Sequence, residues 1–196
     1  LEFRRVLFRS GWRSAERPLW LVGFSDVSAL LLAQVAAGHG GAVHGSTAGD
    51  DAQWQRLAGL LRGEPLQELR GTSWRAGVAR GPLVVTNLTV ATSLIGTPWF
   101  PNLRGAVLLL EDVGEAPYRV DRMLTQWRCS GLLQEVAGIG VGRFRWQEDD
   151  VLPGDLSLDE VLRDRLTDLG VPVLAGLPVG HRSEEHTSEL QSPCNL

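Results

Sequence analysis

Three polar residues, Ser25, Glu111 and His181, each follow a short apolar run of the kind that forms a buried strand. A hydroxyl, a carboxylate and an imidazole are the groups of a nucleophilic triad. The imidazole takes the proton from the hydroxyl, and the carboxylate fixes the imidazole tautomer and stabilises its cation. Reactive groups of α/β proteins gather beyond the carboxyl ends of strands. The pattern therefore predicts a site for nucleophilic catalysis.

The turn Gly23-Phe24-Ser25 joins a predicted strand to a predicted helix. A serine in such a bend is held exposed, and the backbone N–H groups of the first helical turn favour developing negative charge. We expect the backbone N–H of Asp26 to be one oxyanion donor. The common elbow pattern G-x-S-x-G has glycine where Val27 stands here. The alternative is that Ser25 only caps the helix.

The other two candidates have plainer interpretations as well. Glu111 could be a solvated carboxylate at a strand end, its neighbour Asp112 could do the same work, and His181 could be an ordinary loop histidine. His39 and His44 could suggest a metal, but no third ligand follows at a suitable spacing. We therefore expect neither a metal nor another cofactor.

Strand and helix patterns alternate along the interior, which predicts an α/β chain. We expect strands at 19–22, 106–110 and 171–174 and helices at 26–37, 51–62 and 118–133. A Ser157-Leu-Asp-Glu160 capping box should begin a further helix. The glycine-rich stretch 138–142 follows a helix rather than a strand, so a phosphate-binding loop is not expected there.

Composition excludes several classes of protein. The 196 residues are 43% hydrophobic and 21% charged, which is typical of a globular domain. No apolar run reaches the roughly 18 residues of a membrane span. The net charge of −4 disfavours a nucleic-acid partner. Two cysteines are too few for a disulfide scaffold.

Residues 1–10 and 182–196 have the appearance of translated sequencing adapters, so we expect both to be artefacts. The weak pattern near 64–74 suggests a domain boundary. We expect a partial nucleophile domain over 11–68 and a second domain, carrying Glu111 and His181, over 69–181.

Five segments together resemble one known family. LVGFSDVSALLLA resembles the nucleophile segment of the LD-carboxypeptidase family of serine peptidases, and AVHGSTAG its "HGP" segment. NLTVATSLIGTPWFP resembles its "GGNL…GTP…P" segment. VLLLEDVGEAPYRVDRMLTQWRCSGLL is similar to its E-D-x-x-E-x-x-Y-x-[IV]-D-R segment, and PVLAGLPVGH to its P-V-x-x-G-x-P-x-G-H segment. Order and spacing agree over about 17–181.

The resemblance implies that Ser25 is the nucleophile, Glu111 the carboxylate and His181 the base. It implies a cytoplasmic, metal-free enzyme that releases terminal D-Ala from murein tetrapeptides in peptidoglycan recycling. The implied fold is the remnant of an N-terminal flavodoxin-like α/β domain, followed by a β-rich C-terminal domain with helices. The family commonly forms homodimers.

Two alternatives remain open beside that function. The related microcin C self-immunity peptidases cleave a peptidyl or aminoacyl nucleotide, for which Trp99 or Trp146 could form the nucleobase wall. A non-catalytic binding module or an inactive fragment is the second alternative. The family's "GGN" is Val85-Thr86-Asn87 here, and its longer N-terminal segment, which carries a second oxyanion donor, is absent from this sequence.

Overall fold

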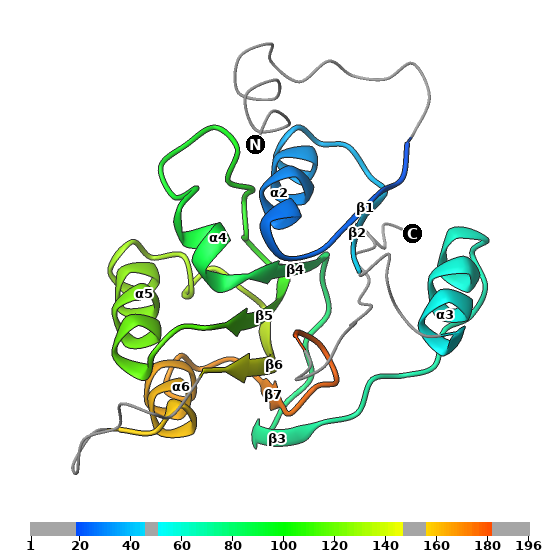
Figure 1. Ribbon diagram of the computed structural model, residues 1–196. Helices are drawn as coiled ribbons and strands as arrows, with labels where there is room; N and C mark the ends of the chain where they lie inside the picture. The colour runs from blue at the N-terminus through cyan, green and yellow to red at the C-terminus, as the bar shows by residue number, and fades with distance from the viewer. Residues whose placement is uncertain (1–18, 46–50, 147–155, 182–196) are drawn as a thin grey trace.

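The computed structural model describes residues 19–45, 51–146 and 156–181, which form two separate sheets. The smaller sheet pairs β1 (Leu21–Gly23) with β2 (Ala42–His44) in parallel. The larger has the order β3-β7-β6-β5-β4. Its strands are β3 (Thr72–Arg75), β4 (Leu83–Asn87), β5 (Val107–Val113), β6 (Gly138–Arg145) and β7 (Val173–Ala175). The chain is thus α/β, as predicted (Figure 1).

Helices connect the strands of both sheets. In the small sheet, the short 3₁₀ helix η1 (Ser25–Val27) and α2 (Ser28–Ala36) lead from β1 to β2. In the large sheet, α4 (Leu88–Thr92), α5 (Pro117–Cys129) and α6 (Leu158–Leu166) join β4, β5, β6 and β7, which run parallel. Only β3 pairs antiparallel among the described strands. Parallel strands point their carboxyl ends to one edge, where the predicted site should lie.

The two faces of the large sheet are covered differently. The main core lies between the sheet and helices α4, α5 and α6, and it includes Leu108 and Leu110 of β5. On the opposite face, Leu109 packs in a small cluster with Val85, Leu177 and Val179. Since side chains alternate along a strand, this arrangement directs the next odd-numbered position, Glu111, toward the segment that precedes His181.

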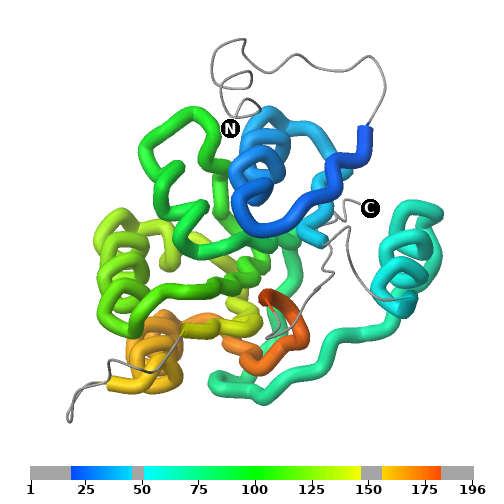
Figure 2. The backbone as a smooth tube through the Cα atoms, in the orientation of Figure 1, coloured from blue at the N-terminus to red at the C-terminus, as the bar shows by residue number. Residues whose placement is uncertain are grey.

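Helix α3 (Asp51–Leu61) lies to one side of both sheets (Figure 2). The helical period places Trp54, Leu57, Leu60 and Leu61 on one face. Of these, only Leu57 is fully buried, while Trp54 is 46% and Leu61 38% exposed. The helix predicted at 51–62 is confirmed, and much of its apolar face remains exposed.

The main element that the sequence pattern missed is β6, a central strand. Its glycines 138, 140 and 142 hide the alternation that marks a strand. Glycine is needed at two of these positions because a Cβ would clash, at Gly138 with Ala79 and at Gly142 with the carbonyl of Val179. The predicted 118–133 helix is also shorter in the structure, where α5 ends at Cys129. The Ser157–Glu160 capping box is confirmed.

Candidate active site

Ser25 stands in a strained turn between β1 and α2. Its φ is +55°, the only positive φ of a non-glycine residue among those described. Such a conformation costs of order 1 kcal/mol and persists only where its surroundings enforce it. A side chain at Gly23 would collide with Val27, so glycine is required two residues before the serine. Val27, which stands where the common elbow has glycine, thus packs its side chain over Gly23.

The structure is inconsistent with Ser25 as a simple helix cap. Phe24 is the N-cap of η1 and Val27 that of α2, and neither has a side-chain cap hydrogen bond. Asp26, the expected oxyanion donor, is the second residue of η1, so its backbone N–H lies in the first turn. Its role as a donor stays a prediction.

Glu111 is fully buried near the carboxyl end of β5. Its Oε2 lies 2.8 Å from Nδ1 of His181. An ionised carboxylate only accepts hydrogen bonds, so Nδ1–H of His181 donates and Nε2 of that ring is left to act as a base. The structure therefore brings together two of the three predicted triad residues, which are 70 positions apart in the sequence.

Two imidazoles control the ionisation of Glu111. Burial alone would raise the pKa of this carboxyl group, but His181 and His44 stabilise its charged form and lower the pKa to about 2. Glu111 is therefore ionised throughout the neutral range, as a carboxylate that orients a catalytic histidine must be.

Asp112, the alternative carboxylate, is directed elsewhere. A register shift between Leu110 and Asp112 interrupts the ladder of β5 and β6, so that both consecutive acidic side chains are buried. The Oδ2 atom of Asp112 accepts hydrogen bonds from the backbone N–H and the hydroxyl of Thr89, each at 2.8 Å. Burial raises the pKa of Asp112, and the bonds from Thr89 oppose that rise. Asp112 thus holds the start of α4, while Glu111 faces His181.

The loop before His181 depends on Gly180. Its φ is +110°, and a Cβ there would lie 2.8 Å from Cβ of Glu111 and 2.9 Å from the carbonyl oxygen of Arg143. The backbone can approach Glu111 so closely only because the residue is glycine. This contact brings the His181 ring within reach of the carboxylate.

Phe24 brings the nucleophile segment against the two histidines. Its ring centroid is 4.4 Å from that of His181 and 5.1 Å from that of His44. No hydrogen bond joins Ser25 to His181 in the described part of the chain. Catalytic hydrogen bonds are often long in unliganded sites and tighten only with substrate, so the geometry remains compatible with a triad.

The sequence indicates His44 as a possible metal ligand and as part of the segment that resembles the family's "HGP", but it assigns no role beside Glu111 to this residue. The described residues contain no group of three or more metal-ligating side chains. His44 instead is fully buried at the end of β2, with Nε2 3.6 Å from Oε1 of Glu111. Its position after a short apolar strand is the same signal that selected the other three residues, and it could have been found that way.

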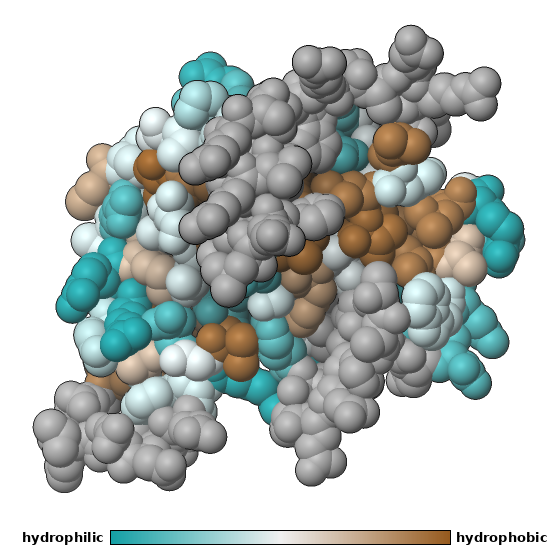
Figure 3. Space-filling view, turned by 45° about the horizontal axis from the view of Figure 1, so that its top comes forward, coloured by the Kyte–Doolittle hydropathy of each residue, from teal (hydrophilic) through white to brown (hydrophobic). Residues whose placement is uncertain are grey.

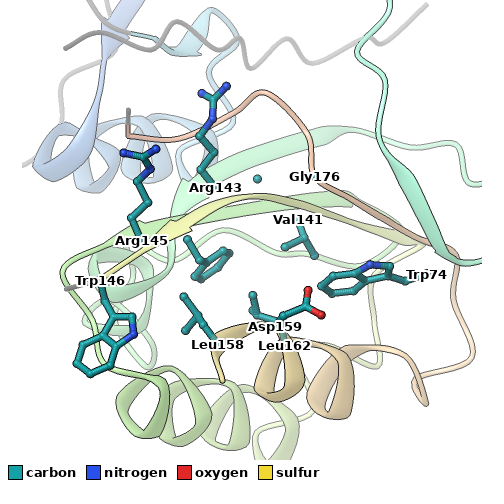
Figure 4. A pocket seen from close by; sticks show the side chains of 11 residues that line it. Trp74, Val141, Arg143, Arg145, Trp146, Leu158, Asp159, Leu162 and Gly176 are labelled. Carbon is teal, nitrogen blue, oxygen red and sulfur yellow. The ribbon is translucent and has the colours of Figure 1, made fainter. Parts of the chain in front are cut away.

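A cavity of about 620 Å³ lies between β6, α6 and the segment around Gly176 (Figure 4). Its lining includes Trp74, Trp146, Arg143 and Arg145. Trp99, the other expected nucleobase wall, packs against the main core instead. Arg143 donates from Nη1 to the carbonyl of Gly180 at 3.4 Å, so the cavity borders the loop that carries His181.

Fold and site together define an α/β protein whose main sheet holds a buried carboxylate–histidine pair near a strained serine. Residues 80–196 match the family described as the LD-carboxypeptidase C-terminal domain. The chain therefore belongs to the LD-carboxypeptidase family, as the sequence resemblance indicates.

Individual relatives agree with this assignment. A Synechocystis protein named as a carboxypeptidase is 48% identical over 183 residues, covering 90% of this chain and 60% of the relative. A muramoyltetrapeptide carboxypeptidase structure from Oxalobacter formigenes matches with a TM-score of 0.67 and 25% identity, over 88% of this chain and 62% of the other. This chain thus spans about 60% of the length of these relatives.

The fold is also shared with the microcin C7 self-immunity protein MccF, in a structure that contains aspartyl sulfamoyl adenosine. The TM-score is 0.64 at 19% identity, over 88% of this chain and 63% of MccF. At that identity the likeness concerns the fold alone.

Every helix within the described residues is too short or too polar to cross a membrane.

Proposed function

We propose that this chain carries the active site of a serine-type LD-carboxypeptidase. The observation that carries the proposal is the 2.8 Å contact between Nδ1 of His181 and Oε2 of the buried, ionised Glu111. That contact leaves Nε2 of His181 as the base, beside a segment whose serine is held at positive φ. These are the parts that activation of a hydroxyl nucleophile requires.

In the proposed reaction, His181 removes the proton from Ser25 as its oxygen attacks the carbonyl that precedes the terminal residue. Glu111 keeps the imidazole in the correct tautomer and stabilises the cation that forms. The backbone N–H of Asp26 donates to the developing oxyanion. His181 then protonates the leaving amine, and water, activated by the same imidazole, hydrolyses the acyl-enzyme.

The proposed substrate is a murein tetrapeptide, from which the enzyme releases the terminal D-Ala in peptidoglycan recycling in the cytoplasm. Its support is membership of the family and the name of the Oxalobacter relative. We expect no metal, no cofactor and no nucleic-acid or membrane partner, and a homodimer for the full-length protein.

The test combines a general probe with a specific substrate. A fluorophosphonate should label the chain at Ser25, and D-Ala should be released from a murein tetrapeptide; both signals should vanish in Ser25→Ala. Far-UV circular dichroism of the two proteins shows whether they are equally folded. A folded wild-type chain that neither reacts with the probe nor releases D-Ala would contradict the proposal and favour the non-catalytic binding module or inactive fragment.

The second candidate function is cleavage of a peptidyl or aminoacyl nucleotide. It is favoured by one observation, a cavity whose lining includes Trp146, Trp74, Arg143 and Arg145, of which Arg143 contacts the His181 loop through the carbonyl of Gly180. Aromatic rings can stack a nucleobase and guanidinium groups can bind a phosphate. Trp146→Ala should then slow hydrolysis of an aminoacyl sulfamoyl adenosine at least about tenfold. Equal rates in the two proteins, or cleavage of the tetrapeptide alone, would remove this candidate.

A further inference from the structure

Outside the predicted triad, His44 has a buried ring that faces the far side of Glu111. Nε2 of His44 and Oε1 of Glu111 are both buried, and neither has a hydrogen-bond partner within the described chain. They face each other at 3.6 Å, just beyond hydrogen-bond range. Buried polar atoms without partners are rare because each costs free energy. Two such atoms that face each other indicate one contact that closes by a small movement.

The surrounding contacts determine which nitrogen of His44 carries the proton. The backbone N–H of Asn87 can only donate, and it faces Oγ of Ser28 at 3.5 Å. The hydroxyl proton of Ser28 is thereby free to donate to Nδ1 of His44, 3.4 Å away. Nδ1 is then the acceptor, so Nε2 carries the ring proton and points it at Glu111.

We propose that His44 is a positioning residue that donates from Nε2 to Oε1 of Glu111, and so holds the carboxylate ionised and turned toward His181. The inference rests on the function proposed above. His44 touches no reacting atom; its effect passes through Glu111. The chain of contacts runs from Asn87 through Ser28 and His44 to Glu111 and His181. It therefore couples the small sheet, which carries the nucleophile, to the large one.

Within the described residues, few charged or titratable groups surround this contact. His44 faces Glu111 from β2, and His181 faces it from the C-terminal loop. On β5 itself, Asp112 is the neighbouring acid, but its carboxylate is bound by Thr89. The other ring against His44 is Phe24, which carries no charge. A pH effect of replacing His44 therefore acts on Glu111 and, through it, on His181.

Two variants separate positioning from simple packing. His44→Leu removes the donor, and His44→Gln keeps an N–H donor on a side chain of similar reach. We expect His44→Leu to lower the rate of fluorophosphonate labelling and kcat about ten- to a hundredfold, the equivalent of one charge-assisted hydrogen bond, with little change in KM. Without the second donor, Glu111 binds the His181 cation more strongly, so the acidic limb of the pH profile should move to higher pH. His44→Gln should restore most of the rate and the original limb.

Acid unfolding gives a readout that needs no activity. Loss of the donor raises the pKa of Glu111, so the acid-unfolding midpoint of His44→Leu should move up by about one pH unit, and that of His44→Gln should not. Wild-type chain that fails to label would overturn the proposed function, while this shift would still report the contact. Equal acid midpoints and equal pH profiles in both variants would overturn the positioning role.

Discussion

The two sheets of this molecule are supported very differently. The five-stranded sheet is covered by α4, α5 and α6 on one face, and its core contains fully buried side chains such as Trp127 and Leu124. The β1–β2 pair has only two strands, and α3 beside it keeps Trp54 half exposed. Apolar surface is visible on the face drawn in Figure 3.

The difference separates the two halves of the proposed reaction. Glu111 and His181 are held by the large sheet, where burial and register determine their geometry. Ser25 is held by a short strand and a strained turn. We conclude that the carboxylate–histidine pair is the rigid half of the site, and that the nucleophile segment is the half that depends most on its local turn.

The largest expected effect comes from removing the centre of the main core. Trp127 is fully buried, donates from Nε1 to the hydroxyl of Thr92 at 2.8 Å and packs edge-on against Phe100. Trp127→Ala should lower the free energy of unfolding by about 3–5 kcal/mol. The matched change Trp54→Ala, on the exposed face of α3, should alter it by no more than about 0.5 kcal/mol. Urea unfolding measures both, and similar losses would refute the contrast between the two regions.

The second effect is the pH dependence that Glu111 gives to the large sheet. Its pKa falls on folding from the ordinary 4.5 to about 2, so its contribution to stability is complete above pH 4.5 and is lost as the pH falls through 2. The full contribution is roughly 3 kcal/mol. In Glu111→Gln, the free energy of unfolding should therefore depend less on pH between 4.5 and about 2.

Asp112 acts in the opposite sense, because its pKa is raised on folding. The effect of Glu111 must therefore be read as the difference between the wild-type and Glu111→Gln curves, in which Asp112 is common to both. Parallel curves between pH 4.5 and 2 would show that Glu111 has no lowered pKa.

The third effect concerns the contact that joins His181 to the sheet. In Gly180→Ala the new Cβ would press against Glu111 and the carbonyl of Arg143 at a φ that alanine rarely adopts. We expect a loss of about 1–3 kcal/mol in stability, together with a loss of labelling at Ser25 larger than the unfolded fraction explains. Labelling by the folded variant at the wild-type rate would show that the close approach of Gly180 is unnecessary.

The smallest effect tests the turn of the N-terminal region. Ser25→Gly relieves the positive φ and should stabilise the chain by about 1 kcal/mol over Ser25→Ala, which keeps the strain. Both variants lack the nucleophile, so differential scanning calorimetry compares the relieved strain with the entropy that glycine adds to the unfolded chain, about 0.4–1 kcal/mol. A melting temperature of Ser25→Gly below that of Ser25→Ala would mean that the turn at Ser25 stores no strain.

The sequence by itself determined much of this outcome. Apolar runs and helix signals located β1, β5, β7 and their helices, because burial and capping leave patterns over a few neighbouring residues. Strand ends followed by Ser25, Glu111 and His181 indicated the candidate site, and the family resemblance joined them. The division into domains at residue 68 and the catalytic roles themselves stay predictions.

Other features were decided only by tertiary structure. The glycines of β6 hide a central strand from the sequence pattern. Two of them are required by close contacts with Ala79 and Val179, which exist only in the folded chain. The choice of Glu111 over Asp112 follows from strand alternation and a register shift between β5 and β6. His44 belongs to the small sheet and Glu111 to the large one, so the two residues become neighbours only when the sheets pack together. Such contacts join residues tens of positions apart, and no local pattern encodes them.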